Sequence, residues 1–194
     1  MFWQRIRFHI FKWFRPLMVG NYKRHDGVRL PNTRISNTTF FYNEENFHVG
    51  DYVFIGHHNF IDAQVGVTVE EGCQITNFVS ILNHSSHTAI RLYGKAYDEG
   101  PMVGYHSGKV HIGAYTFIGP HAIIMPNTHI GKGSIVSAYS YVRGTFPDFA
   151  IISGNPAVVV GDTRTTDQPF LDQYPELKPL YNEWASPPPD SEHP

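Results

Sequence analysis

Two histidines, His84 and His87, lie in the segment NHSSH, at the point where a regular pattern in the chain stops. An imidazole titrates near neutral pH, so it can take a proton from a group while that group attacks an electrophile. A long polar stretch follows before the pattern resumes. These residues predict an active site inserted into a scaffold. The alternative is an ordinary polar loop that happens to contain histidines.

The scaffold is visible as a six-residue repeat on both sides of this interruption. The leading positions are Val49, Ile55, Ile61, Val67, Cys73 and Val79, then Ile112, Ile118, Ile124, Ile130, Val136 and Val142. Such a period fits neither an α-helix nor a long alternating strand, but it fits a coil with three short sides per turn of eighteen residues. We therefore predict an all-β fold, a left-handed parallel β-helix, in which each leading residue points inward and stacks on the residue eighteen later.

Glycines follow several leading residues, and we expect them at corners, where a missing Cβ lets the chain bend tightly. These are Gly50, Gly56, Gly113, Gly119 and Gly131. Cys73 is the one leading residue that is neither Ile nor Val, and we expect it to fill the core rather than to react.

The repeat divides the chain into three parts. An N-terminal arm or helix covers 1–34, the β-helix covers 35–162 with a long loop at 85–109, and a C-terminal segment covers 163–194. Within the last part, residues 168–185 read as one or two short helices that cap the open end of the coil, followed by a disordered proline-rich tail.

The composition argues against several classes of protein. A net charge of −2 gives no reason to expect nucleic acid as a partner. The single cysteine rules out an intrachain disulfide and favours a reducing cytoplasm, and no apolar run is long enough to span a bilayer.

The first 24 residues are basic and aromatic, with no acidic residue before Asp26. At helical spacing one stripe is apolar, and it consists of Trp3, Ile6, Ile10, Trp13 and Leu17. Two interpretations stay open. Such a helix packs on the main domain or a neighbouring subunit, or residues 1–20 rest on the inner face of an anionic membrane. The acidic C-terminal segment could also attract the basic N-terminal segment.

The segment 110–162, and above all GNPA at 154–157, resembles the hexapeptide-repeat acyltransferases. The resemblance covers about 35–162. It implies acetyl-CoA as acyl donor, a sugar or glycan as acceptor, and a homotrimer with active sites between subunits. Among subgroups the chain looks most like O-acetyltransferases that modify surface polysaccharides, which would place a lipid-linked acceptor at the cytoplasmic membrane face.

The resemblance also implies roles for single residues. His84, the sixth residue of its repeat, stands where the galactoside and maltose enzymes carry their catalytic histidine, with His87 as the second choice. By the same analogy Asp62 and Asn59 bind the sugar. The loop 85–109 arches over the cleft or walls the site of a neighbouring subunit, and its Arg91 and Tyr93 are among the groups that would contact substrate.

Coenzyme A would lie along the second block of repeats in this family. The residues expected to bind it are Phe117, Gly119, Ser137, Ala138, Arg143, Asn155 and Arg164. Phe117 stands where many members have tryptophan.

Three other functions are alternatives to sugar O-acetylation. Amine acetylation of an amino sugar or nucleotide sugar is the main alternative, although such enzymes usually carry an additional N-terminal domain. A carbonic-anhydrase-like zinc site would need three histidines, whereas we expect no metal. A surface-binding coil would need ranks of threonine in register, which are missing.

Overall fold

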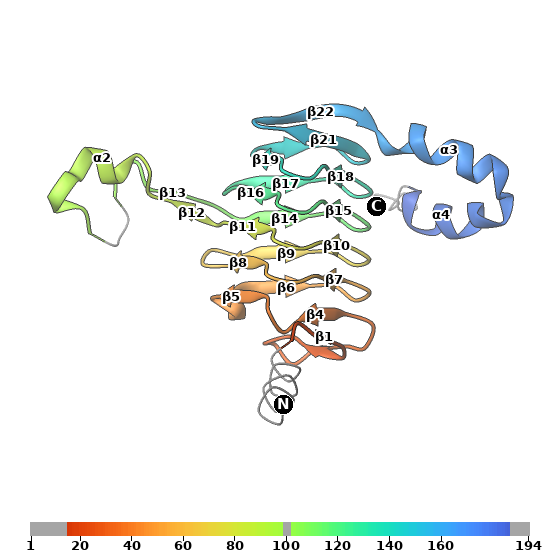
Figure 1. Ribbon diagram of the computed structural model, residues 1–194, viewed down its shortest axis with the longest axis horizontal. Helices are drawn as coiled ribbons and strands as arrows, with labels where there is room; N and C mark the ends of the chain where they lie inside the picture. Colours follow the sequence, from red (N-terminus) through yellow and green to blue (C-terminus); the bar gives the residue numbers. More distant parts are fainter. Residues whose placement is uncertain (1–14, 99–101, 187–194) are drawn as a thin grey trace, which may run out of the picture.

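The computed structural model describes residues 15–98 and 102–186, and its centre is a coil of three parallel sheets (Figure 1). The first sheet contains β4 (Arg34–Ser36), β7 (Phe54–Ile55), β10 (Gln74–Ile75), β15 (Phe117–Ile118), β18 (Ile135–Val136) and β21 (Ala150–Gly154). The second contains β5 (Phe40–Tyr42), β8 (Phe60–Asp62), β11 (Ser80–Ile81), β16 (Ile123–Ile124) and β19 (Tyr141–Val142). The third contains β6 (Phe47–Val49), β9 (Val67–Val69), β14 (Val110–Ile112), β17 (Thr128–Ile130) and β20 (Thr145–Phe146).

All twelve leading residues of the repeat are buried, and each sheet pairs its strands in parallel between successive turns. Backbone hydrogen bonds run from turn to turn; the amide of Gly119, for example, donates to the carbonyl of Val136 at 2.8 Å. The predicted hexapeptide β-helix is confirmed.

The stacking interval differs between the two blocks. After the interruption Ile118 stacks on Val136, eighteen residues later, as predicted. Before it the interval is twenty: Ile55 stacks on Ile75 and not on Cys73. The two additional residues lie between the second and third sides: Ile61 to Val69 spans eight positions, whereas the equivalent Ile124 to Ile130 spans six. The prediction of eighteen was therefore wrong for the first block.

The predicted role of the glycines was also wrong. None of the five has a positive φ; the left-handed corners are formed by side-chain-bearing residues such as Tyr115 and His121, at φ 57° and 60°. The glycines lie where the backbone of the next turn passes closely. A Cβ on Gly113 would come within 2.5 Å of the amide nitrogen of Lys132.

The long loop leaves the coil as an arm (Figure 1). Its two ends pair antiparallel as β12 (His84–Ser85) and β13 (His106–Ser107). The short helices α2 (Ala89–Tyr93) and η2 (Gly94–Ala96) lie at its outer end. Within one chain the loop therefore projects outward, and its place over a cleft or against a neighbouring subunit stays a prediction.

At the N-terminal side, β1 (Met18–Val19) pairs antiparallel with β4, and β2 (Tyr22–Lys23) and β3 (Arg29–Leu30) form a hairpin. A 3-10 turn, η1 (Glu44–Asn46), precedes β6. The apolar stripe predicted for the N-terminus lies outside the described residues except for Leu17, whose amide donates to the side chain of Asn37 at 2.8 Å.

The C-terminal segment begins with β22 (Ala157–Asp162), which pairs antiparallel with β21 and covers the last coil edge. Helix α3 (Thr163–Gln173), η3 (Pro175–Leu177) and α4 (Lys178–Ala185) follow, so two helices are present as predicted, starting earlier than expected. They lie beside the coil rather than over its end, because Trp184 stacks on Tyr115 at 4.7 Å. The tail expected to be disordered lies outside the described residues from 187 onward. Within the described ranges, no helix is long and apolar enough to cross a membrane.

The close approach of neighbouring backbone predicts that substituting alanine will destabilise the protein at one glycine and not at another. Gly113→Ala should lower the free energy of unfolding by about 1–3 kcal/mol, because the new methyl group meets rigid backbone. Gly20→Ala is the matched control, since its Cβ meets only the Arg34 side chain at 3.9 Å. Urea unfolding of both variants measures this, and equal stability of the two would contradict the packing account.

The buried thiol gives a second prediction. Burial raises the pKa of Cys73 to about 12, and its Sγ donates to the carbonyl of Gly113 at 3.1 Å. The native protein should therefore not react with a charged disulfide reagent at pH 8, whereas the chain in urea should release one equivalent of chromophore. Rapid reaction of the native protein would show that the thiol is accessible.

Candidate active site

His84 and Asp62 form a close pair at one corner of the coil. His84 Nδ1 lies 2.6 Å from Asp62 Oδ2, with side-chain exposures of 37% and 1%. Both atoms are buried, and within the described part of the chain neither has another hydrogen-bond partner. The second carboxylate oxygen of Asp62 accepts a hydrogen bond from the amide of Gln64 at 3.0 Å.

This contact decides what the ring can do. With Asp62 beside Nδ1, the neutral tautomer that fits the pair carries its proton on Nδ1 and leaves Nε2 free to accept one. A carboxylate in this place also stabilises the imidazolium formed when Nε2 takes a proton. The ring of Tyr105 stacks on His84 at 5.6 Å, nearly parallel, and helps to hold its plane.

Asn83, the residue before His84, holds the base of the arm and was missed by the sequence analysis. It is completely buried. Its Oδ1 accepts from the amides of Val65 and Gly66, and its Nδ2 donates to the carbonyls of Gly66 and Gly108. The side chain thus ties the point where the arm leaves to the point where it returns. A signal was present, since an asparagine at the fifth position of a repeat unit, just before the chain leaves the coil, needs hydrogen-bond partners.

The two residues expected to bind sugar have different surroundings. Asp62 contacts His84, so its geometry fits an orienting group; its contact with a sugar stays a prediction. Asn59 is buried. Its amide nitrogen donates to the carbonyls of Gly56 and Thr76, and its oxygen accepts from the amide of Val79. It has no accessible polar atom, so the prediction for Asn59 was wrong.

His87 lies on the arm and apart from the carboxylate. Its Nδ1 is 2.7 Å from the hydroxyl of Ser85, and its exposed ring stacks on His106 at 4.9 Å. Arg91 donates to the carbonyl of His87, and the hydroxyl of Tyr93 accepts from the amide of Val103 at 3.2 Å. Both belong to α2 at the outer end of the arm (Figure 1), so one chain does not bring them together with His84.

Four of the residues expected to bind coenzyme A lie on neighbouring turns. The backbone of Gly119 passes Ala138 so closely that a Cβ would lie 2.6 Å from its amide nitrogen. Ser137 precedes Ala138, and its amide donates to the next turn, at Ile152. Phe117, on the outer face of β15, is 39% exposed.

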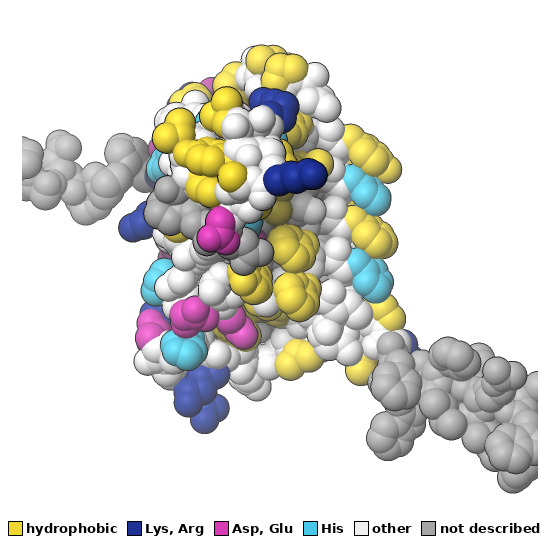
Figure 2. All heavy atoms as spheres, turned by 90° about the vertical axis from the view of Figure 1, so that its left-hand side faces the viewer, with side chains coloured by type: hydrophobic (Ala, Val, Ile, Leu, Met, Phe, Trp, Pro, Cys, Tyr) yellow, Lys and Arg dark blue, Asp and Glu magenta, His cyan; other side chains and the backbone are white. Residues whose placement is uncertain are grey.

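A ladder of stacked aromatic rings, which the sequence analysis did not predict, runs from turn to turn along one corner of the coil. His58, Phe78, His121 and Tyr139 stack in succession at 5.2, 5.0 and 4.7 Å. Figure 2 shows histidine and hydrophobic side chains alternating along one edge of the molecule. The sequence signal is a ring at the left-handed corner position of four successive turns.

The remaining three expected cofactor residues are exposed near the end of the coil. Among the described residues, the side chains of Arg143 and Asn155 form no hydrogen bond or ion pair. Arg164 pairs with Asp162, with 2.5 Å between Nη2 and a carboxylate oxygen, and lies over the ring of Phe149. Its guanidinium lowers the pKa of Asp162. Their binding of coenzyme A stays a prediction.

Among the described residues, no group of three or more His, Cys, Asp or Glu side chains is arranged to hold a metal ion.

Comparison with known proteins finds similar proteins among acyltransferases. The bacterial transferase hexapeptide (six repeats) family matches residues 109–144, so this segment carries the repeat of that family. One relative is a provisionally named acetyltransferase of Mycobacterium tuberculosis, Rv3034c, at 26% identity over 69% of this chain and 43% of that protein. The chain thus spans less than half of that relative's length.

Two Escherichia coli proteins are also similar. One is dTDP-4-amino-4,6-dideoxy-D-glucose acyltransferase, at 27% identity over 68% of this chain and 69% of that protein. The other, WbbJ, is provisionally named a lipopolysaccharide biosynthesis O-acetyl transferase. It is 30% identical over 60% of this chain and 57% of that protein.

Solved structures show the same fold. Galactoside acetyltransferase in complex with coenzyme A has a TM-score of 0.57 and 24% identity, covering 67% of this chain and 62% of that one. A second structure is AntD, an N-acyltransferase from Bacillus cereus in complex with dTDP and 3-hydroxybutyryl-CoA. It has a TM-score of 0.56 and 20% identity, and the match covers 76% of this chain and 89% of that one.

The clamp at the base of the arm can be tested without an activity assay. Asn83→Ala removes four hydrogen bonds; the Gly66 amide and carbonyl keep backbone partners, whereas the amide of Val65 and the carbonyl of Gly108 lose the side-chain partner. The variant should therefore lower the free energy of unfolding by about 1–3 kcal/mol. Asn46→Ala removes one bond, to the carbonyl of Gln64, and should change stability by less than about 0.5 kcal/mol. Urea unfolding measures both, and protease cleavage within 85–109 should become faster only in Asn83→Ala.

Proposed function

We propose that this protein transfers an acetyl group from acetyl-CoA to a hydroxyl group of a sugar, with His84 as general base. The observation that carries the proposal is the contact between His84 Nδ1 and the buried carboxylate of Asp62. A sugar hydroxyl is a weak nucleophile until its proton is removed, and an imidazole oriented by a carboxylate performs that task.

The reaction follows from this geometry. Nε2 of His84 takes the hydroxyl proton as the oxygen attacks the thioester carbonyl and a C–O bond forms. The tetrahedral intermediate then collapses, the C–S bond breaks, and His84 returns the proton to the leaving sulfur. Asp62 stays ionised throughout and stabilises the imidazolium between the two steps.

Acetyl-CoA as donor is supported by the hexapeptide repeat at 109–144 and by the similar proteins. Galactoside acetyltransferase was solved with coenzyme A and AntD with an acyl-CoA. In this chain the exposed ring of Phe117 and the closely packed turns at Gly119 and Ala138 offer a surface for the pantetheine arm.

We further propose that the site is completed in a homotrimer. The arm projects from its own coil (Figure 1), so Arg91 and Tyr93 would reach the His84 site of a neighbouring subunit. There they would contact the acceptor.

Acylation of an amino sugar nucleotide is the second candidate. It is favoured by the match to a dTDP-amino-sugar acyltransferase over about two thirds of both chains. A neutral amine attacks a thioester without losing a proton first, whereas a hydroxyl needs a base in place. The buried Asp62 behind His84 therefore favours the hydroxyl acceptor.

The decisive experiment measures thiol release from acetyl-CoA with a panel of sugars, nucleotide sugars and glycan fragments. His84→Ala should lower kcat by about 10²–10⁴-fold because the base is lost. Asp62→Asn should lower it less, since a ring remains. His87→Ala should retain most of the activity, because that ring lies apart from the carboxylate.

Loss of activity in His87→Ala with retention in His84→Ala would show that the base belongs to the arm. Turnover with amino sugars and with no hydroxyl acceptor would establish the second candidate instead.

A further inference from the structure

A small polar hollow lies on the outer side of the third sheet, where the chain comes from the Asp62 corner. The residues that line it include His48, Gln64, Gly66, Thr68 and Lys109, from three successive turns of the coil. Its volume is about 240 Å³, the space of about eight water molecules at ~30 Å³ each. Such a hollow has room for one sugar ring.

Gln64 joins this hollow to the proposed base. Its amide donates to the carboxylate of Asp62 at 3.0 Å, and its side-chain oxygen accepts from the hydroxyl of Tyr105 at 3.3 Å. The ring of Tyr105 in turn stacks on His84 at 5.6 Å. A sugar ring that contacts Gln64 therefore lies next to the residues that orient His84.

The returning end of the arm positions Lys109 at this hollow. The residue before it, Gly108, donates to the carbonyl of Asn83 at 2.9 Å and accepts from the Asn83 side chain at 3.1 Å. The residue after it, Val110, donates to the carbonyl of Gly66 at 3.1 Å. The Lys109 stem then passes over Gly66, since a Cβ on that glycine would lie 3.7–3.9 Å from three of its methylene carbons. Both neighbours thus fix the backbone of Lys109, and the glycine leaves room for its stem.

The hollow is polar, and its one permanent charge is positive. Among its described lining residues only Lys109 is permanently charged, and none is a carboxylate. Within the described part of the chain, the Lys109 ammonium, the Thr68 hydroxyl and the amide nitrogen of the Gln64 side chain form no hydrogen bond or ion pair. Hydroxyl and amide groups bind sugar hydroxyls, and an ammonium group binds carboxylate or phosphate.

We propose that this hollow binds the acceptor, and that the acceptor is an acidic sugar whose carboxylate or phosphate group lies on Lys109. Thr68 and Gln64 then contact its hydroxyl groups, and the hydroxyl that is acetylated faces Nε2 of His84. The proposal rests on the sugar acetylation proposed above, and it adds the charge of the acceptor and the residue that recognises it.

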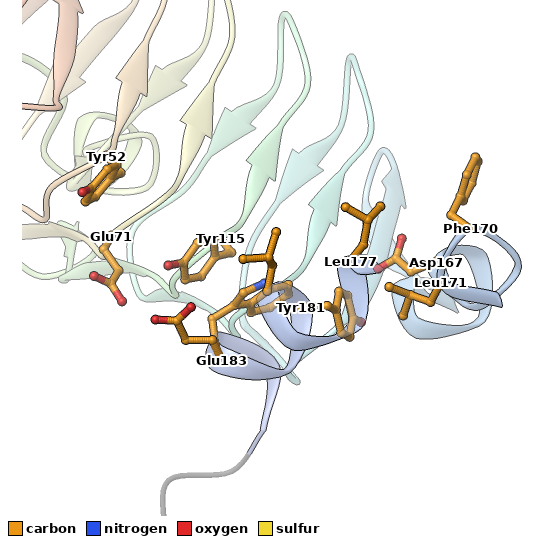
Figure 3. Close-up of a pocket in the computed structure, with 11 residues that line it drawn as sticks. Tyr52, Glu71, Tyr115, Asp167, Phe170, Leu171, Leu177, Tyr181 and Glu183 are labelled. Carbon is orange, nitrogen blue, oxygen red and sulfur yellow. The ribbon is translucent and has the colours of Figure 1, made fainter. Parts of the chain in front are cut away.

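A larger groove, of about 950 Å³, does not fit this ligand (Figure 3). It lies between the C-terminal helices and Tyr115, which precedes β15, whereas His84 follows β11 at another corner. Its lining includes Glu71, Asp167 and Glu183 and, among the described residues, no lysine or arginine. These carboxylates would repel an acidic sugar, so charge distinguishes the two cavities.

Equilibrium binding tests the proposal without acetyl-CoA. The ligands are the methyl glycosides of glucuronate, galacturonate and mannuronate, the corresponding methyl hexoside 6-phosphates, and the matched neutral methyl hexosides. Each is titrated against the full chain and followed by ligand-observed NMR. At least one acidic sugar should bind about fivefold more tightly than its neutral counterpart at low salt, and the preference should shrink as NaCl is raised. The carboxylate and phosphate series show which anion the hollow takes.

Variants of Lys109 test the residue. Lys109→Gln should abolish the preference for the acidic sugar, and Lys109→Arg, which keeps the charge, should retain it. Lys178→Gln is the matched control, because it removes a lysine at the start of α4, beside the larger groove, and should change nothing. In the thiol-release assay, the ratio of kcat/KM for acidic over neutral acceptors should fall about fivefold in Lys109→Gln.

Equal binding of acidic and neutral sugars by the unmodified protein would overturn the proposal, and so would a preference that Lys109→Gln leaves intact. The proposed reaction fails in a different way. Binding of an acidic sugar that depends on Lys109, without thiol release from acetyl-CoA, would support the acidic-sugar site and contradict the acetylation.

Discussion

The fold depends on one constraint: every turn of the coil must place its inward side chains and its backbone groups in register with the turns on either side. The parallel pairing of Ile75 with both Ile55 and Ile118 shows this across the interruption itself. The turns on the two sides of the arm still stack as if nothing had been inserted. An insertion is compatible with this only if it leaves and returns at one corner. The antiparallel pair β12–β13 and the amide of Asn83 achieve that.

The same constraint creates the candidate site. Register brings the end of β8 beneath the point where the arm begins, so a carboxylate and an imidazole 22 residues apart come within 2.6 Å. Asp62 is almost fully buried and His84 is partly exposed, so the carboxylate is shielded while the ring remains reachable. The rigid coil thus holds the orienting group, and the ring that would meet substrate lies at the edge of the scaffold. A buried carboxylate needs a partner, and here the partner is the residue proposed to do the chemistry.

Much of this was predictable, because an inward position must be apolar in every turn and therefore repeats in the sequence. That requirement revealed the coil, the interruption and His84. The roles of polar residues in the coil were harder to predict. Asn59 and Asp62 are both short polar residues on one side of the coil, yet Asn59 donates to backbone carbonyls and Asp62 contacts the ring of His84. The two additional residues of each early turn, which lie between the second and third sides, also escaped the six-residue count, so the stacking partners in the first block could not be read from it. The place of the C-terminal helices depends on the contact of Trp184 with Tyr115, between residues far apart in the chain, and no local pattern encodes it.

The central claim is that Asp62 orients His84 with a proton on Nδ1 and leaves Nε2 free as the base. Nitrogen-15 NMR of the histidine rings tests it most directly, with His84 assigned by its loss in His84→Ala and spectra recorded in alkaline buffer, where histidine rings are neutral. The account predicts an Nδ1–H tautomer for His84 that changes in Asp62→Asn. An Nε2–H tautomer in the unmodified protein, or a spectrum insensitive to Asp62→Asn, would contradict it.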